Sequence, residues 1–531
     1  MFIGGSLALA ADCGIAGSLA RSESVIHQLG ESVLSCAMPI SLSEEQFIDL
    51  AASHSVVPVA MEVLGDRDKP VSVFEKLVGD ADGFLLESVE KGERWARWSF
   101  VGWDPAFTVV SRDGRTSVEG ADLSLPEGDP LTVLDNLVQR YRAPSPADSA
   151  LGASAPPLHG GLVGYLAYDI VRYIEDLPDQ PPDDRQLPEM IWHFTGAMAA
   201  IDSLRDSIIL IRNVFVGNDP AGQYRDAVAK IAEDAQRLAG FGLPGAGVRP
   251  APVVPGDAEA NVTQDDFENT VRKAIDYINS GEAFQIVPSV RFAVDFDGDA
   301  FSVYRALRLI NPSPFMYFFR HGTLSIAGSS PELMTRVRDG VVYSRPIAGT
   351  RPRGETPEED ARLEEELLAD TKELAEHVML VDLARNDVGR VCEFGSVEVD
   401  ELMVVERYSH VMHIVSGVSG RLRTGLGPVD VLRATFPHGT VTGAPKVRAM
   451  EIVDELETTA RGPYAGAVGY IDFSGNVDTA IGLRTMIADG TRAWVQAGAG
   501  IVADSDPEKE YRECVAKATA VLTAIAAAPE L

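Results

Sequence analysis

The sequence has little cysteine. It holds four cysteines in 531 residues, Cys13, Cys36, Cys392 and Cys514, and no two of them form a CxxC pair. A zinc ribbon and a thioredoxin-type redox site both need closely spaced cysteine pairs, so both are excluded. Cysteines this few and this scattered fit a reducing compartment, where thiols need no disulfide partner. We therefore expect a cytoplasmic protein whose fold rests on its hydrophobic core.

Basic residues are also scarce. The 46 lysines and arginines are outnumbered by 79 aspartates and glutamates, which gives a formal net charge of −33. Such a surface repels phosphate backbones and anionic lipids, so we expect no nucleic-acid partner and no membrane partner. An anionic small molecule would have to be held by a few focused arginine, lysine or backbone N–H groups.

Long apolar runs are missing as well. No run of about 18 consecutive apolar residues occurs, so we expect no transmembrane helix. Residues 1–20 carry Asp12 as their one charge, and the positive residue that a secretory signal peptide needs at its start is absent. We expect residues 1–42 to be a disordered N-terminal extension, with Met38 as an alternative start. The sequence Ser43-Glu-Glu-Gln46 then predicts a capping box that opens a helix.

Two stretches rich in proline, glycine and alanine, 143–161 and 240–262, are typical of loops or linkers. They divide the chain into regions that we predict as an extension (1–42), an N-terminal regulatory region (43–240), a linker (241–262) and a catalytic region (263–528).

Secondary-structure patterns favour a mixed fold. Two predicted strands, Tyr464–Phe473 and Thr479–Ile487, are separated by the turn Ser474-Gly-Asn-Val, which predicts an antiparallel hairpin. Helices are predicted over 219–238, 265–280, 357–384 (with one break) and 506–527. Helices combined with antiparallel strands argue against a doubly wound parallel sheet.

Two Glu-x-x-Glu spacings are candidates for chemistry. Glu373 and Glu376 lie in one predicted helix, and Glu510 and Glu513 repeat the spacing in the last helix. This spacing places both carboxylates of a pair on one helix face. Four convergent carboxylates would bind a hard divalent cation such as Mg²⁺, which prefers oxygen ligands. On spacing alone, a solvated acidic face is the favoured alternative in so acidic a chain.

Two glycine-rich segments are candidates for binding an anion. Gln496–Ile501 ends a predicted strand, and its glycines would let backbone N–H groups approach an anion, with a tight turn or bulge as the alternative. Pro437–Lys446 lacks the GxxxxGK[ST] spacing, and Pro445 removes an N–H donor, so we reject an ATP-binding loop. A Gly/Thr turn opening a helix would still suit a carboxylate.

Single polar residues complete the candidates. Arg484 is a charge inside an otherwise apolar predicted strand, so it is either paired with an internal acid or directed at an anionic ligand. His413 is a candidate acid or base, with a structural histidine as the favoured alternative. His410 lies three residues earlier, but no third ligand accompanies the pair, so a zinc site is not expected there.

Several motifs occur together in one order, and they are densest after residue 261. They are Gly281-Glu-Ala-Phe-Gln-Ile-Val-Pro-Ser, Ser330-Pro-Glu332, Pro346-Ile-Ala-Gly-Thr-Arg351, Lys372-Glu-Leu-Ala-Glu-His377, Leu380-Val-Asp-Leu-Ala-Arg-Asn-Asp387, Gly439-Thr-Val-Thr-Gly-Ala-Pro-Lys446, Arg461-Gly-Pro-Tyr464 and Gly498-Ala-Gly500. Over about residues 57–527 the chain thereby resembles the chorismate-utilising enzymes, specifically the component I type of anthranilate synthase.

The resemblance implies an α+β fold, in which two antiparallel β-sheets pack face to face with helices outside. It also implies a Mg²⁺-dependent lyase reaction, the first step of tryptophan biosynthesis. Chorismate and ammonia are converted to anthranilate and pyruvate through 2-amino-2-deoxyisochorismate. Ammonia adds at ring carbon 2 as the hydroxyl on carbon 4 departs, and pyruvate is then eliminated.

Residue roles follow from the same resemblance. Glu332 would protonate the leaving hydroxyl, and His413 would assist the later elimination. Glu376 and Glu513 would be the principal metal ligands, with Glu373 and Glu510 beside them. The remaining site residues are the chorismate contacts Gly349, Thr350 and Tyr464, the further contacts Thr440 and Lys517, and the groups that would hold the pyruvyl carboxylate, namely Arg484 and the N–H groups of Gly498, Ala499 and Gly500.

Two positions separate the related activities. Isochorismate and salicylate synthases resemble this chain but place a lysine at the position of Gln285, where it activates water. Aminodeoxychorismate synthases place a lysine where this chain has Ala348, which has no amine for a covalent intermediate. The alternatives that remain are an aminodeoxychorismate synthase component I and a non-catalytic, tryptophan-binding regulatory subunit.

The resemblance also implies feedback control and a partner subunit. Leu85-Leu-Glu-Ser88 and Asn311-Pro-Ser-Pro-Phe-Met-Tyr317 match the tryptophan pocket of the family, although core packing would also explain their apolar residues. The expected effector contacts are Glu87, Ser88, Pro314, Phe315 and Met316. No cysteine lies in a Gly-x-Cys-x-Gly nucleophile turn, so a separate glutamine amidotransferase subunit is expected to supply ammonia.

Overall fold

The computed structural model describes residues 40–88, 97–145, 148–149, 151, 155–240, 254–408 and 411–531. The predicted N-terminal extension therefore lies almost entirely outside the described residues, as do most of the predicted linker, Cys13, Cys36 and His410. Residues from Ser41 to Leu531 form one compact unit.

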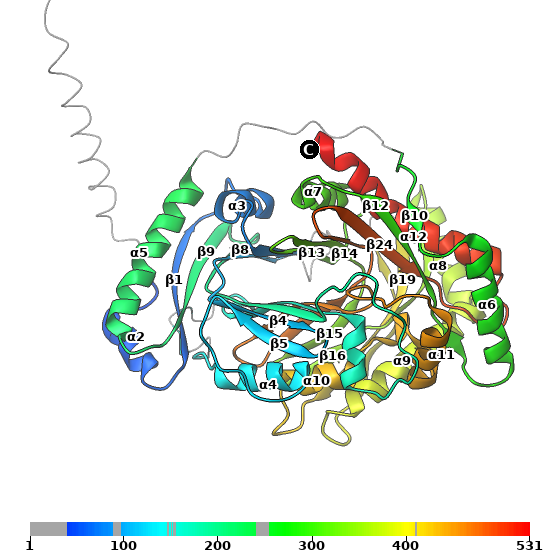
Figure 1. The fold of residues 1–531 in the computed structure, drawn as a ribbon, viewed down its shortest axis with the longest axis horizontal. Helices are drawn as coiled ribbons and strands as arrows, with labels where there is room; N and C mark the ends of the chain where they lie inside the picture. Colours follow the sequence, from blue (N-terminus) through cyan, green and yellow to red (C-terminus); the bar gives the residue numbers. More distant parts are fainter. Residues whose placement is uncertain are drawn as a thin grey trace, which may run out of the picture. The chain divides into compact units, whose positions relative to one another are not determined.

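Two large antiparallel sheets organise this unit (Figure 1). The first has the strand order β1 (Val56–Leu64), β9 (Ser207–Phe215), β8 (Ala197–Asp202), β3 (Trp98–Trp103), β2 (Gly83–Glu87), β13 (Phe315–His321), β14 (Leu324–Ser330), β23 (Thr485–Ala488), β24 (Arg492–Gly498), β12 (Ser289–Asp295) and β10 (Glu259–Ala260).

The second sheet has the order β17 (Ile347–Pro352), β19 (Val411–Arg421), β16 (Val341–Ser344), β15 (Leu333–Arg338), β22 (Val477–Ile481), β21 (Ala467–Asp472), β6 (Gly161–Leu166), β7 (Met190–Phe194), β4 (Phe107–Arg112) and β5 (Arg115–Glu119), and β18 (Glu398–Arg407) also pairs with β19. Both sheets join strands from the two halves of the sequence, since β2 pairs with β13 and β6 pairs with β21. The short strands β11 (Gln285–Ile286) and β20 (Gly443–Ala444) pair separately.

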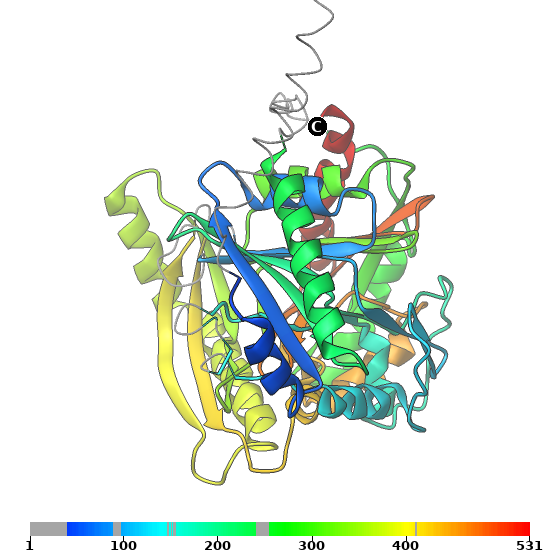
Figure 2. The ribbon, with the colours of Figure 1, turned by 90° about the vertical axis from the view of Figure 1, so that its left-hand side faces the viewer.

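Helices cover the outer faces of the sheets, and Figure 2 shows α5 lying along β1 and β9. The described α-helices are α2 (Glu44–Ala51), α3 (Pro70–Leu77), α4 (Pro130–Arg140), α5 (Pro220–Ala239), α6 (Gln264–Asn279), α7 (Ala300–Ile310), α8 (Pro357–Ala369), α9 (Thr371–Gly389), α10 (Pro428–Thr435), α11 (Lys446–Leu456) and α12 (Pro507–Ala527). None of the described helices is both long enough and apolar enough to cross a membrane.

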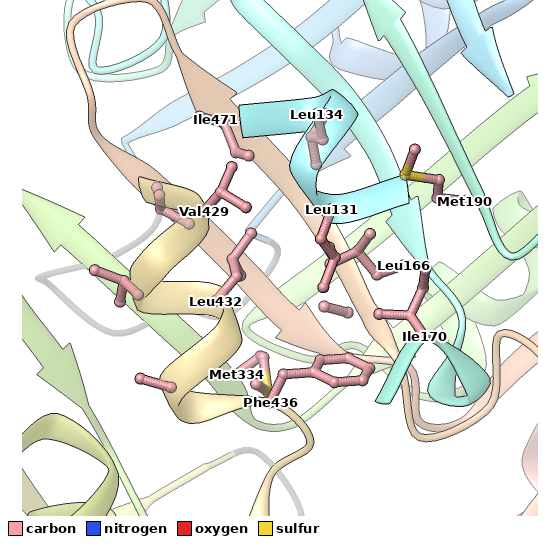
Figure 3. Packing of buried hydrophobic residues seen from close by; sticks show 14 of the residues in the cluster. Leu131, Leu134, Leu166, Ile170, Met190, Met334, Val429, Leu432, Phe436 and Ile471 are labelled. Carbon is pink, nitrogen blue, oxygen red and sulfur yellow. The ribbon is translucent and has the colours of Figure 1, made fainter. Parts of the chain in front are cut away.

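Two apolar clusters hold the layers together. One lies between the sheets and includes Phe84 and Tyr317 from the first sheet and Tyr165 from the second. The other lies between the second sheet and the helices outside it, where Leu131 of α4 and Leu432 of α10 meet (Figure 3). Burying one such side chain stabilises the fold by about 1.5–3 kcal/mol. The expected α+β fold with two face-to-face antiparallel sheets is therefore confirmed.

Local signals account for most element boundaries. The predicted capping box is present, because the Gln46 N–H donates to Ser43 Oγ at 3.2 Å and the Ser43 N–H donates to Gln46 Oε1 at 2.9 Å. The predicted helical region 357–384 is broken once, between α8 and α9, where the Asp370 side chain caps the new helix. Acceptors at a helix start satisfy N–H groups that have no partner within the helix.

One strand prediction was wrong. The hairpin of β21 and β22 is present, but its second strand ends at Ile481 instead of continuing to Ile487. The chain then leaves the second sheet and enters the first as β23. The residues from Thr479 to Ile487 form one apolar pattern, which predicts a single strand. The turn that divides this stretch depends on the packing of the two sheets, which a local pattern does not encode.

Candidate active site

Glu332 lies where the chain passes from β14 in the first sheet to β15 in the second. The residue is 3% exposed, and its Oε1 accepts a hydrogen bond of 2.9 Å from Thr440 Oγ1. Burial raises the pKa of this carboxyl to about 8, although hydrogen bonds from Thr440 and the Ile347 N–H lower it. The carboxyl is therefore protonated at neutral pH, which is the state that a general acid needs.

A second residue beside this acid, His438, was missed by sequence reasoning. Its Nδ1 accepts from the Thr440 N–H at 3.3 Å and lies 3.7 Å from Glu332 Oε1. Burial lowers the pKa of His438 to about 3, so the ring is neutral. The ring therefore helps to position Thr440 without adding a charge beside Glu332. The Pro437–Lys446 segment was singled out from the sequence, but nothing there distinguished this histidine.

His413 of β19 faces Thr350 of β17 in the strand register. Its Nδ1 lies 3.1 Å from the Gly349 carbonyl and 3.0 Å from Thr350 Oγ1. A carbonyl can only accept, so Nδ1 carries the proton and Nε2 keeps its lone pair. Burial lowers the pKa of His413, with a smaller contribution from nearby Arg484. The structure thus brings four predicted site residues together, namely Gly349, Thr350, His413 and Arg484. It leaves His413 as a neutral base.

The two predicted glutamate pairs lie on α9 and α12, and their charges interact across the two helices. Burial raises the pKa of Glu376, and the charges of Glu373 and Glu513 raise it further. Burial also raises the pKa of Glu510, again with a contribution from Glu513. Gln285 Nε2 donates to Glu376 Oε1 at 3.0 Å, which places Gln285 at the same cluster.

The donor set of this cluster fits a hard divalent cation. All four side chains offer carboxylate oxygens, and their mutual repulsion is the kind that a bound cation relieves. Within the described chain, no three of these glutamates bring ligand oxygens within 4.8 Å of one another. Mg²⁺ suits such a spread set, because it commonly keeps several waters and uses one or two carboxylates. Gly349 links this cluster to His413, since a Cβ on Gly349 would lie 3.4 Å from Glu373 Oε2.

Arg484 occupies the turn where the chain changes sheets, with φ of 46°, and does not lie inside a strand as predicted. Its Nη1 donates to Asn311 Oδ1 at 3.2 Å. Among the ion pairs of the described residues, none includes Arg484, and burial lowers the pKa of its guanidinium. A largely buried cation with a neutral partner is suited to an anionic ligand.

The glycine-rich strand end needs one correction. The Ala499 N–H donates to the Pro288 carbonyl at 3.1 Å, so it is committed to the fold and is not free for a ligand. The two glycines instead make room for neighbours. A Cβ on Gly498 would lie 2.7 Å from Tyr464 Oη, and a Cβ on Gly500 would lie 2.7 Å from Gln285 Nε2.

Lys517 of α12 lies at the same strand end. Its Nζ donates to the Gly498 carbonyl at 2.9 Å and forms an ion pair of 2.7 Å with Glu513. Lys517 therefore connects the strand end with the glutamate cluster. Two more predicted residues, Gly498 and Lys517, thus lie beside that cluster.

The predicted effector residues also meet, on adjacent strands. Glu87 at the end of β2 pairs with Met316 of β13, so Ser88 follows next to Phe315. Ser88 Oγ is buried and has no hydrogen-bond partner within the described residues. A buried hydroxyl without a partner costs about 1–3 kcal/mol, which a bound ligand would recover.

The carboxylate of Glu87, which was expected to contact the effector, already has two hydrogen-bond partners within the protein. It accepts from Arg308 Nε at 2.6 Å and from the Tyr304 hydroxyl. These two bonds use the carboxylate to anchor α7 on the sheet. The sequence analysis predicted Glu87 as an effector contact because Leu85-Leu-Glu-Ser88 as a whole matches the family's tryptophan pocket.

Comparison with known proteins identifies the family of this chain. The family model described as chorismate binding enzyme matches residues 82–523. Anthranilate synthase component 1 from Acetivibrio thermocellus is 45% identical over 491 residues, covering 91% of this chain and 98% of the relative. The protein of the same name from Mycolicibacterium smegmatis is 46% identical over 523 residues, covering 95% of this chain and 97% of the relative.

Solved structures support the same family and the same fold. Anthranilate synthase component I from Streptococcus pneumoniae matches with a TM-score of 0.71 and 34% identity, over 87% of this chain and 99% of that one. The menaquinone-specific isochorismate synthase from Escherichia coli shares the fold, with a TM-score of 0.66 and 18% identity over 91% of this chain and 98% of that one. Together with the site geometry, these matches confirm the resemblance: the chain belongs to the anthranilate synthase component 1 family of chorismate-binding enzymes.

Proposed function

We propose that this chain converts chorismate and ammonia to anthranilate and pyruvate. The observation that carries the proposal is the buried carboxyl of Glu332, which is neutral because its pKa is about 8 and is held by Thr440 at 2.9 Å. Breaking the bond between ring carbon 4 and its hydroxyl requires a proton on the leaving oxygen. A carboxyl that stays protonated at neutral pH can supply that proton.

The remaining residues divide the other tasks. Arg484, together with Gly500, would hold the pyruvyl carboxylate of chorismate, since a buried guanidinium without a carboxylate partner favours an anion. Ammonia adds at ring carbon 2 as water leaves from carbon 4. The neutral His413, with its lone pair on Nε2, then takes the ring proton as pyruvate is eliminated.

Glu376 and Glu513, with Glu373 and Glu510 beside them, would hold Mg²⁺, whose charge would orient the ring carboxylate of chorismate. Gln285 keeps Glu376 in place through its 3.0 Å hydrogen bond. Tyr464, Gly349 and Thr350 would complete the walls around the substrate.

The aminodeoxychorismate alternative is disfavoured by Ala348, which is buried in β17 and carries no amine. The non-catalytic alternative is disfavoured because the residues proposed for catalysis and substrate binding, Glu332, His413 and Arg484, are all present. A fluorescence assay for anthranilate with chorismate, Mg²⁺ and ammonium salt distinguishes these functions.

We also propose that a separate glutaminase subunit delivers the ammonia. The purified chain should form anthranilate with ammonium salt but not with glutamine. Burial raises the pKa of Cys392 to about 11 and that of Cys514 to about 12, so neither is a thiolate at neutral pH. Cys13 and Cys36 lie outside the described residues, and neither has the Gly-x-Cys-x-Gly context. Glutamine-dependent product from the purified chain would contradict this prediction.

Tryptophan is the proposed feedback inhibitor, and its site includes Ser88, Pro314, Phe315 and Met316. The segment that contains three of these residues also contacts Arg484. Asn311, at the start of the matching segment, accepts from Arg484 and donates to Ser329 Oγ at 3.2 Å. An effector that shifts this segment would therefore displace the guanidinium proposed to hold chorismate.

Replacing Ser88 with Phe should relieve inhibition by tryptophan while largely keeping turnover. The bulky ring fills the space of the effector and removes a hydroxyl whose hydrogen bond is worth about 1–3 kcal/mol, or roughly 5–150-fold in affinity. Inhibition curves and melting temperatures of both proteins check this result. Ser88→Ala is the matched control, which should weaken inhibition less because it removes the hydroxyl without filling the site. An unchanged inhibition curve in Ser88→Phe would assign Ser88 to packing alone.

A further inference from the structure

Three side chains with metal-binding atoms converge outside the chorismate site, where the two sheets face each other. Asp82 precedes β2, and His321 ends β13, so both belong to the first sheet; His193 lies in β7 of the second sheet. One ligand atom from each of the three lies within 4.8 Å of the other two. This is the one such group among the described residues, and its members are far apart in sequence.

The distances match the edges of a tetrahedral metal site. His193 Nε2 lies 3.3 Å from His321 Nδ1, and His321 Nδ1 lies 3.2 Å from Asp82 Oδ2. Two nitrogen ligands at about 2.0–2.1 Å from a tetrahedral zinc ion are about 3.3 Å apart. Two of the three ligand-to-ligand distances therefore match those around a single ion, and all three atoms lie within 4.8 Å of one another.

Neighbouring groups hold the ligands as outer partners do in metal sites. Glu119 Oε2 lies 3.3 Å from His321 Nε2, on the side of the ring facing away from the cluster. A carboxylate on the far nitrogen favours the tautomer whose Nδ1 lone pair points at the ion. The Gly322 N–H donates to Asp82 Oδ1 at 2.8 Å, which leaves Oδ2 toward the histidines.

The surroundings of His193 also suit a ligand. The ring is 1% exposed, and its Nε2 lies against His321 Nδ1 instead of solvent. With the proton of His321 on Nε2, where Glu119 can accept it, Nδ1 offers a lone pair beside His193 Nε2 and Asp82 Oδ2. A cation satisfies all three at once, whereas one shared proton does not.

We propose that Asp82, His193 and His321 bind one Zn²⁺ ion, with water as the fourth ligand. Two imidazoles and a carboxylate form a donor set that zinc favours, with one position open. The Asp82 side chain is 38% exposed, which gives the ion a path from solvent. Because the ligands come from both sheets, the ion would act as a cross-link between them. This inference does not depend on the proposed catalytic function.

The test uses the full chain, purified without a histidine tag, stripped with a chelator and kept in excess Mg²⁺ to occupy the glutamate cluster. Titration with Co²⁺ should give the absorption of a tetrahedral site with one ion per chain, and Zn²⁺ should abolish it. Zn²⁺ should also raise the melting temperature, since an ion that binds the folded state stabilises it.

Variants assign the ligands. His321→Ala and Asp82→Ala should lose the Co²⁺ spectrum and the thermal shift, yet keep the ammonium-dependent turnover that reports a folded chain. His54→Ala, at a histidine outside the cluster, should retain both signals. Glu119→Gln should bind about 10–100-fold more weakly, as expected for an outer partner.

Two results would overturn the proposal. One is a wild-type chain that shows no tetrahedral Co²⁺ spectrum. This would mean that the cluster instead holds a proton, with an imidazolium at His321 donating to Asp82 and Glu119. The other is a spectrum that survives unchanged in both ligand variants, which would place the ion elsewhere.

Discussion

Replacing Glu332 with Gln should lower kcat for ammonium-dependent anthranilate formation by about 10²–10⁴-fold, the usual contribution of a positioned acid. Glutamine keeps the shape of the side chain and can still accept the 2.9 Å hydrogen bond from Thr440. It cannot donate a proton to the departing hydroxyl as the carboxyl can. The KM for chorismate should change little, because the substrate carboxylates are held by other groups.

The pH dependence provides an independent check. The Glu332 carboxyl is the active acid while it is protonated, so kcat/KM for chorismate should fall as pH rises through about 8. The measurement must keep the concentration of free NH₃ constant, since ammonia itself titrates in this range. Glu332→Gln should lose this alkaline limb. A variant within tenfold of the wild type, or one that keeps the limb, would assign the proton to another group.

Replacing Glu513 with Gln should abolish ammonium-dependent turnover at ordinary Mg²⁺ concentrations while leaving the fold intact. The substitution removes one anionic ligand, which weakens Mg²⁺ binding and leaves the substrate carboxylate without its partner. It also removes the negative charge from the 2.7 Å ion pair with Lys517, although the amide oxygen can still accept a hydrogen bond. Both partners of this ion pair are partly exposed to solvent, so the melting temperature should change little.

Activity measured against Mg²⁺ concentration tests this prediction. Raising Mg²⁺ should restore part of the turnover of Glu513→Gln, as expected of weakened metal binding. Glu508→Gln on the same helix is the matched control, because Glu508 pairs with exposed Arg512 and should be dispensable. Near-normal turnover of Glu513→Gln at ordinary Mg²⁺ would remove Glu513 from the metal site.

Patterns that depend on short sequence spacing were predicted well. The Glu-x-x-Glu spacing places Glu373 and Glu376 on one face of α9 because a helix brings residues three apart to the same side. The cap at Ser43 and the β21–β22 hairpin are equally local, and both are confirmed. The motif order carried the family assignment, which the comparisons confirm.

Features set by contacts between distant segments were not predictable in this way. Arg484 has the pattern of a strand residue, yet the chain turns there to change sheets. The glycine-rich sequence predicted that the Ala499 N–H is free to bind a ligand, but in the fold it donates to the Pro288 carbonyl. Likewise, His193 and His321 meet only because two sheets pack face to face, and no spacing in the sequence encodes that meeting.

The central claim is the reaction itself. Its most direct test is to incubate the purified chain with chorismate, ammonium salt and Mg²⁺ and to quantify anthranilate by fluorescence and pyruvate by an enzymatic assay. The proposed function predicts that the two products form in equal amounts and that tryptophan suppresses both. Accumulation of an aminated chorismate without pyruvate release, or no turnover at all under these conditions, would contradict it.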